Sequence, residues 1–279
     1  MEHVEIAEQP GPSRPDTPVE RSASASFVYA IGRVAPRFPS LAVEKEFAQV
    51  TGRAETAGLT DRQTMHAVLS DRANRYLARQ MCWVFMIEGL ETYLLVPRDP
   101  ADLDLLVEAL RPEPGTSDVD VVIGVRGPIA SPEMCNGLMI PIVAFDQLYS
   151  FDRGELIQAI PRPKGYAEEK FRATAEELFD RFGQVADNAG ATDEHRALNY
   201  LAVRYPAVYA RAADAYAAEC ALTRVEVRPS RLSGTRTIMD CVFSYTHRRT
   251  DVTEQSFCRV DVTEEFPFLI TKLSPFYER

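Results

Sequence analysis

The chain ends in four successive β-strand patterns, and its longest helical patterns come directly before them. In the helical part, apolar residues recur every three or four positions over Ala167–Ala186 and again between Thr192 and Glu219. The strand patterns are rich in β-branched and aromatic residues and cover Leu222–Arg228, Thr235–Thr246, Thr253–Val262 and Phe268–Leu273. This segregation predicts an α+β fold that ends in an antiparallel β-meander.

The register of one hairpin in this meander can also be predicted. If its turn centres on Arg249 and Thr250, three cross-strand pairs follow: Cys241 opposite Cys258, Asp240 opposite Arg259, and Val242 opposite Phe257. This register places opposite charges across from each other and apolar residues across from apolar residues, so both kinds of pairing support it. A slip of one residue would move the two apolar sets to opposite faces of the sheet.

The first half of the chain mixes strand and helix patterns. We expect a helix capped by Ser40 and a second helix that runs from Thr60 to Gln80. The expected strands are Phe27–Ile31 closed by Gly32, a hairpin of Met81–Ile87 with Thr92–Val96, Asp118–Val125 ended by Gly127-Pro128, and Met139–Phe145. Pro141 within the last of these indicates an edge strand or a bulge.

Composition changes mark the expected boundaries. Residues 1–25 are rich in Pro, Glu and Ser and have almost no large apolar side chain, so they are expected to form a disordered tail or linker. Pro161-Arg162-Pro163 is the best internal boundary. It separates a mixed α/β half, residues 26–163, from residues 164–279, which contain the helices and the antiparallel sheet. We expect residues 26–279 to fold as one cooperative domain.

The net charge, the apolar runs and the cysteines limit the partners and the cellular compartment that can be expected. The formal net charge of −10 disfavours nucleic-acid binding because the chain would repel a polyphosphate. The longest nearly uninterrupted apolar run, Met81–Ile87, is far too short to cross a bilayer. Five widely spaced cysteines without a CxxC motif are typical of reduced thiols. Together these features predict a cytoplasmic protein without a membrane partner.

No motif of a known reaction stands out. The sequence lacks GxSxG, GxxxxGK[ST] and GxGxxG, and its four histidines form no HxxxH pair. We therefore expect no cofactor and no metal site. Cys135 is the most reactive-looking thiol because it lies beside Asn136 in a polar loop. It is either a nucleophile of an unassigned reaction, which needs a nearby base, or an ordinary loop cysteine.

Positive charge gathers in one loop of the otherwise acidic chain. Arg228 and Arg236 lie at the two ends of the loop that joins the first two strands of the C-terminal meander, and Arg231 lies within it, with Ser and Thr residues between them. Arginines in such a loop can bind carboxylates in a bidentate manner. The alternative is a solvated face that is balanced by nearby Asp and Glu.

Several long stretches of the chain carry a family resemblance. In the first half these stretches are Phe27–Arg33, Pro36–Phe47, Leu59–Gln63, Cys82–Val84, Tyr93–Asp99 and Met134–Leu138. In the second half they are Ala186–Tyr200, Val227–Leu232 and Leu273–Tyr277. Together they resemble the C-terminal domain of PatG-type cyanobactin maturation proteases, and the resemblance covers nearly everything from Phe27 onward.

This resemblance implies work in the biosynthesis of ribosomally made, post-translationally modified peptides. It does not imply protease activity, because a separate subtilisin-like domain supplies that activity in the family and its Asp-His-Ser motifs are absent here. The matching domain has no known function. We expect a non-catalytic accessory module that binds a precursor peptide or a partner maturation enzyme. The alternatives are an enzyme centred on Cys135 and Asn136, and a dimerising scaffold.

Overall fold

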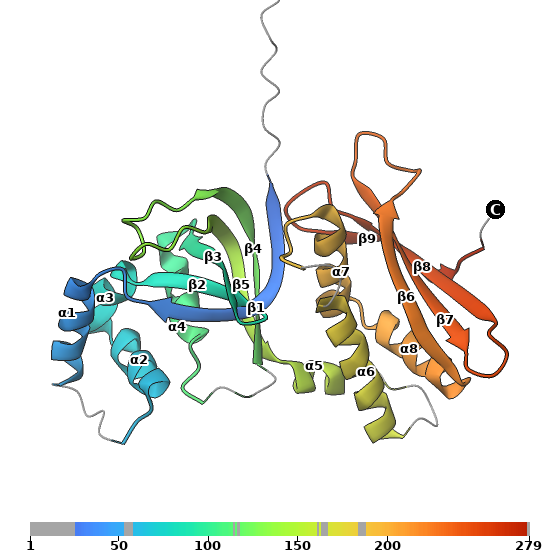
Figure 1. The fold of residues 1–279 in the computed structure, drawn as a ribbon, viewed down its shortest axis with the longest axis horizontal. Coiled ribbons are helices and arrows are strands. Elements are labelled where there is room, and N and C mark those ends of the chain that lie inside the picture. The colour runs from blue at the N-terminus through green and yellow to red at the C-terminus, as the bar shows by residue number, and fades with distance from the viewer. Residues whose placement is uncertain are drawn as a thin grey trace, which may run out of the picture.

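The N-terminal half is built around a closed β-barrel (Figure 1). The computed structural model describes residues 26–52, 58–113, 115, 118–160, 162, 167–183 and 188–277. The barrel strands are β1 (Phe27–Arg37), β2 (Cys82–Ile87), β3 (Leu90–Pro97), β4 (Asp118–Ile129) and β5 (Pro141–Asp152). Their order is β1-β2-β3-β5-β4, and β4 pairs back with β1. Only β3 and β5 pair in parallel among these strands. This is the strand order of the OB-fold, a five-stranded Greek-key barrel.

Glycine allows β1 to take part in two sides of the barrel. The strand pairs with β4 up to Gly32 and with β2 from Arg33 onward. A Cβ atom on Gly32 would collide with the carbonyl oxygen of Met86 and would lie 2.7 Å from Cε1 of Phe85. The prediction that Gly32 ends this strand is therefore wrong. Gly32 is where one long strand passes close to the backbone of its neighbour.

The fourth and fifth strands are also longer than predicted. Gly127 and Pro128 do not end β4, because Ile129 still pairs with Pro141. Strand β5 pairs with β3 on one side and with β4 on the other, so the expectation of an edge strand at Pro141 is wrong. Pro141 is the first residue of β5, a position where a missing N–H is tolerated. The register of β4 shifts between Arg126 and Ile129, the partner of Pro141, which agrees with the other predicted alternative, a bulge.

Short helices cover the barrel between its strands. Helices α1 (Leu41–Thr51), α2 (Asp61–Ser70) and α3 (Arg75–Gln80) connect β1 to β2, and α4 (Leu103–Glu108) lies between β3 and β4. The predicted caps are confirmed: Ser40 accepts from the N–H of Val43, and Thr60 forms a capping box with Gln63. The expected single helix from Thr60 to Gln80 is wrong, since a 3₁₀ turn capped by Asp71 divides it.

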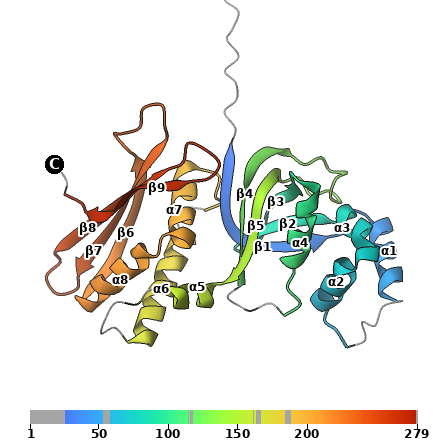
Figure 2. The ribbon, with the colours of Figure 1, turned by 180° about the vertical axis from the view of Figure 1, so that it is seen from behind.

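The second half is a four-stranded sheet with helices on one face (Figures 1 and 2). Helices α5 (Arg153–Ala159), α6 (Glu168–Gly183), α7 (Asp193–Arg204) and α8 (Ala207–Ala217) precede strands β6 (Cys220–Pro229), β7 (Ile238–His247), β8 (Thr253–Asp261) and β9 (Phe268–Pro275). The predicted register is confirmed, with Cys241 opposite Cys258. Nε of Arg259 lies 2.8 Å from Oδ1 of Asp240, as the expected charge pairing requires.

The core of this half lies between the helices and the sheet. Phe182 of α6 meets Phe243 of β7 edge-on, with ring centroids 6.0 Å apart. Cys241, Cys258 and Tyr245 are buried in the same cluster. The fold is thus α+β, as predicted, with an antiparallel meander at its C-terminal end. No described helix is long and apolar enough to cross a membrane. The predicted tail at 1–25 and both prolines of the predicted boundary lie outside the described residues.

Helix α7 joins the two halves, since it packs against β1 as well as against the C-terminal sheet (Figures 1 and 2). Nδ2 of Asn199 donates to the carbonyl oxygen of Tyr29 in β1 at 2.7 Å. The N–H of Tyr29 in turn donates to the carbonyl oxygen of Gly190 at 2.9 Å. A Cβ atom on Gly190 would lie 2.7 Å from Cα of Ala30, so the two backbones approach here as closely as glycine permits.

Candidate functional site

The predicted arginine loop is the connection between β6 and β7, and its three arginines have different surroundings. Nε of Arg236 lies 2.6 Å from Oδ2 of Asp261, a carboxylate whose side chain is only 1% exposed. Arg236 also lies over the ring of Phe268, 5.0 Å from its centroid. Arg236 is therefore committed to a buried carboxylate of its own chain, and its contribution to a ligand site is limited.

Arg228 and Arg231 are more available than Arg236. Arg228 is 41% exposed and stands 3.6 Å from Glu226, which also pairs with Arg224 at 3.2 Å. Arg231 is exposed at the loop tip beside Leu232, and it forms no ion pair with any described residue. An exposed ion pair such as Arg228–Glu226 is weak, so an incoming carboxylate can replace Glu226. The guanidinium of Arg231 can bind a carboxylate without displacing a partner among the described residues.

The serines of this loop use their polar groups for hydrogen bonds that hold the shape of the loop. The N–H of Ser230 donates to the carbonyl oxygen of Ile238 at 2.8 Å. The hydroxyl of Ser233 donates to the same carbonyl at 3.0 Å and accepts from the N–H of Ile238 at 3.1 Å. The loop is therefore a closed, hydrogen-bonded turn that presents Arg231 outward.

The open face of the C-terminal sheet continues from this loop as a row of arginines and aromatic rings. The guanidinium of Arg228 lies 5.4 Å from the ring centroid of Phe276, and that of Arg259 lies 4.8 Å from Phe257. The rings of Phe257 and Phe276 are 5.4 Å apart at a steep angle. The face thus presents positively charged and aromatic side chains, and the cation–π contacts between them restrict the motion of both kinds of side chain.

Cys135 is placed differently from the sequence-based expectation. It forms a disulfide with Cys82 of β2, with a Cα–Cα distance of 5.9 Å, and its side chain is fully buried. The prediction of five reduced thiols is therefore wrong for this pair. A sulfur bonded in this way offers no thiolate nucleophile. Asn136 beside it adopts a left-handed backbone conformation, φ 46°, in a turn that Gly137 continues.

The other thiols and His247 serve the structure. A hydrogen bond to Cys258, together with complete burial, raises the pKa of Cys241 well above its ordinary value, so its thiol stays protonated. Nδ1 of His247 accepts from the N–H groups of Arg249 and Thr250 at 3.2 and 3.3 Å and so shapes the β7–β8 turn. Within the described residues, no group of three or more His, Cys, Asp and Glu side chains is placed to hold a metal ion.

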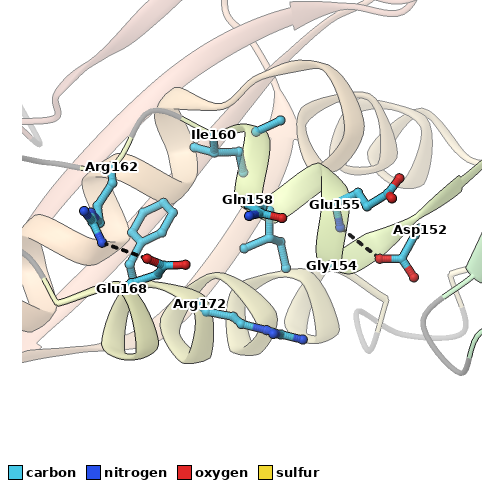
Figure 3. Close-up of a pocket in the computed structure, with 11 residues that line it drawn as sticks. Asp152, Gly154, Glu155, Gln158, Ile160, Arg162, Glu168 and Arg172 are labelled. Atoms are coloured by element: carbon cyan, nitrogen blue, oxygen red, sulfur yellow. Dashed lines mark hydrogen bonds and ion pairs between the residues drawn. The ribbon is translucent and has the colours of Figure 1, made fainter.

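A cavity of about 640 Å³ lies between α5 and α6 (Figure 3). Ile157, Ile160 and Phe171 supply its apolar lining. Four of its charged side chains, Asp152, Arg162, Glu168 and Arg172, already have partners, and that of Arg172 is Glu176, 2.9 Å away. Arg162 lies 3.5 Å from Glu168, and Asp152 accepts from the N–H of Glu155 at 2.8 Å (Figure 3). None of the residues predicted as candidates from the sequence lines this cavity.

A carboxylate pair at the junction of the two halves escaped the sequence analysis. Glu265, in the β8–β9 connection, lies beside Asp146 of β5, and both carboxylates face Arg98. Nη1 of Arg98 lies 2.6 Å from Asp146 and 3.5 Å from Glu265. Burial, reinforced by the hydrogen bond and the charge of Asp146, raises the pKa of Glu265 to about 7 from an ordinary 4.5. Glu265 therefore holds a proton that it would lose on unfolding at pH 6.

This pair predicts a specific pH dependence of stability. Because the pKa of Glu265 is higher in the folded chain, the stabilisation is complete below pH 4.5 and disappears as the pH rises through about 7. Glu265→Gln keeps a donor for Asp146 but cannot ionise. We expect this variant to match the wild type at pH 5 and to exceed it at pH 8 by about 1 kcal/mol, after allowance for solvent screening. Urea unfolding at both pH values measures the difference.

The matched control is Glu264→Gln, which removes the same charge from an exposed neighbouring side chain. It should change stability by a similar small amount at both pH values. Parallel stability curves for the wild type and Glu265→Gln between pH 5 and 8 would show that Asp146 and Glu265 do not share a proton.

Comparison with known proteins agrees with this architecture. Residues 165–276 match the model of a family described as PatG C-terminal. No curated protein matches the chain. A solved structure described as "PatG Domain of Unknown Function" superposes with a TM-score of 0.73 at 20% sequence identity, over 90% of this chain and 99% of that chain.

The two halves of the chain differ in the kind of similarity that they show to known proteins. Over the second half the resemblance to the PatG family is one of sequence, and over the first half the likeness to the solved structure is one of fold. Residues 165–276 are similar in sequence to the PatG C-terminal family, and the chain as a whole has a fold similar to that of the PatG domain of unknown function.

Proposed function

We propose that this chain is a non-catalytic accessory module that binds a precursor peptide or a partner enzyme during the maturation of ribosomally made peptides. The match of residues 165–276 to the PatG C-terminal family carries this proposal. That region includes the whole arginine loop and the open face of the C-terminal sheet. The proposal includes a cytoplasmic location, where the precursor peptide is made.

The binding surface that best fits an acidic peptide segment is the arginine loop with the adjoining sheet face. Arg231 offers an exposed guanidinium next to Leu232, a side chain that is 61% exposed. Arg228 offers a second one that a ligand carboxylate can take over from Glu226. Phe276 beneath Arg228 supplies an apolar contact. A helical segment with acidic and apolar residues on one face matches this combination.

Charge reversal at the loop tip tests the proposal. Titration calorimetry with a synthetic acidic leader peptide should show binding to the wild type. Arg231→Glu should weaken it at least tenfold, because an attractive contact becomes a repulsive one. The loss should shrink as salt is raised, since screening acts first on exposed pairs. Arg231 has no partner among the described residues, so folding should be unaffected.

A matched control is Arg249→Glu, which makes the same change of net charge in the β7–β8 turn at the other end of the sheet. Arg249 is 76% exposed and lies 2.8 Å from Glu219. It should bind the leader as well as the wild type does. An equal loss in both variants would indicate a response to total charge alone. Equal binding by Arg231→Glu and the wild type would remove the arginine loop from the proposal.

A further inference from the structure

The connection between β4 and β5 lies over the outside of the barrel. This segment, residues 130–140, is called the strap here. Its buried residues Ala130 and Cys135 pack with Cys82 and Val84 of β2 and with Leu94 of β3. The neighbouring residues of β2 and β3 point the other way, into the barrel: Trp83, Phe85, Tyr93 and Leu95 belong to the interior cluster. The strap therefore covers an apolar outer face of β2 and β3.

The outer face of β2 and β3 corresponds to the ligand-binding face of barrels with this strand order. Ligands of OB-folds bind across strands 2 and 3 and the loops beside them, including the loop between strands 4 and 5. In this chain that loop is the strap, and it lies on the face itself. Val84 and Leu94 are only 2% and 4% exposed beneath it. While the strap is in place, the face cannot accept a ligand.

Few interactions fix the strap to the strands below. Its backbone hydrogen bonds are internal, for example from Gly137 N–H to the carbonyl oxygen of Pro132 at 2.7 Å and from Ala130 N–H to that of Ile140 at 2.8 Å. Outside the regular elements, no backbone hydrogen bond among the described residues joins the strap to β2 or β3. What remains is apolar contact, a 3.5 Å contact between Sγ of Cys82 and the carbonyl oxygen of Met134, and one covalent bond, the disulfide between Cys135 of the strap and Cys82 of β2.

We propose that the Cys82–Cys135 disulfide is a redox-controlled latch that holds the strap over the β2–β3 face. The thiolate of a reducing dithiol attacks one sulfur of the pair, and the S–S bond breaks to give a mixed disulfide. The second thiol of the reductant then displaces the protein sulfur. The reductant leaves as a disulfide, having supplied two electrons, and Cys82 and Cys135 each take up a proton. The strap is then held by apolar contacts and the weak contact of the Cys82 thiol with the Met134 carbonyl, and it opens to uncover Val84 and Leu94.

The position of the latch suits a reversible device. Cys135 is fully buried and Cys82 is 5% exposed, so the reductant reaches the sulfurs only when the strap opens. Reduction is therefore slower than for an exposed disulfide, and reoxidation needs the strap back in place. Disulfides that form in a reducing cytosol are typically transient and redox-sensing. This inference rests on the barrel alone and is independent of the peptide-binding surface on the C-terminal sheet.

Hydrogen exchange of the full-length chain in its oxidised and reduced forms tests the latch. After mild oxidation, peptide mapping should find Cys82 linked to Cys135. Dithiothreitol should then release both thiols. Amide exchange in the strap should become at least tenfold faster on reduction, and exchange in β7 and β8 should stay unchanged. Absence of the linked peptide after oxidation, or equal strap exchange in both forms, would overturn the proposal.

Two variants complete the test. Cys82→Ser/Cys135→Ser should show the fast strap exchange with or without dithiothreitol. Cys220→Ser, which alters a buried free cysteine of the C-terminal half, should keep the full response of the wild type. If the double variant fails to fold, the comparison of oxidised and reduced wild type still decides.

Discussion

Replacing Gly124 with alanine is expected to destabilise the protein by about 3 kcal/mol. Gly124 lies in β4, close against the backbone of β5. A Cβ atom there would lie 2.6 Å from Cα of Phe145 and would collide with the carbonyl group of Ala144. Both obstacles are backbone atoms, which cannot move aside as a flexible side chain can. The strands would have to separate in a region where Phe145 is fully buried. Urea unfolding measures the loss.

The same strand provides a matched control. A Cβ atom on Gly127 would meet nothing closer than the carbonyl oxygen of Ile142, at 3.6 Å, which is an ordinary contact. Gly127→Ala should change the free energy of unfolding by less than about 0.5 kcal/mol, as most exposed substitutions do. A loss for Gly124→Ala no greater than for Gly127→Ala would mean that close packing of β4 on β5 does not limit the barrel.

The C-terminal sheet was the most predictable part of the fold because its order in space follows its order in the sequence. Each strand pairs with the next one, so alternation and turn residues are enough to define the pairing. The register of Asp240 with Arg259 could be deduced from the two strands and their turn alone. The caps at Ser40 and Thr60 were predictable for the same reason, since each depends on residues three positions away.

The barrel could not be predicted because its closure depends on contacts between distant segments. Strand β1 pairs with β4, and β3 pairs in parallel with β5, and neither pairing leaves a mark in the local sequence. Gly32 and Gly127-Pro128 are local signals for a strand end. In the closed barrel both strands run past these signals: Gly32 allows β1 to approach β2 closely, and β4 continues beyond Gly127-Pro128 because Ile129 still pairs with Pro141.

The candidate site shows the same division. The arginine loop was identifiable as a local concentration of charge, but Asp261, the carboxylate that commits Arg236, lies on another strand. Nothing in the sequence near Arg236 indicates a buried carboxylate. The disulfide joins cysteines 53 residues apart and the Asp146–Glu265 pair joins the two halves, so only the fold could reveal them.

A buried polar network makes the two halves depend on each other. Asn199 of α7 is 1% exposed, and its Nδ2 donates to Tyr29 of β1 and to Oδ1 of Asn188 at 2.7 and 3.1 Å. Asn188 returns a hydrogen bond to Asn199 at 2.7 Å and donates to the carbonyl oxygen of Phe182 in α6 at 2.9 Å. The side chain of Asn199 thus connects the barrel to α7 and, through Asn188, to α6. We therefore expect residues 26–279 to unfold in a single transition.

Asn199→Leu should destabilise the chain by about 2–4 kcal/mol and separate the unfolding of its halves. Leucine has a similar volume, but it leaves the buried Tyr29 carbonyl without its Asn199 donor and removes both hydrogen bonds between Asn199 and Asn188, at about 1–3 kcal/mol for each buried group that loses a partner. The single tryptophan, Trp83, lies in the barrel core and reports on the first half, whereas far-ultraviolet circular dichroism reports on the whole chain. In urea the two curves should coincide for the wild type and diverge for Asn199→Leu. Asn74→Leu, which removes one partly buried hydrogen bond to Val68 within the first half, should leave them coincident. Divergent wild-type curves would mean that the halves unfold independently, and coincident curves for Asn199→Leu would mean that this network does not couple them.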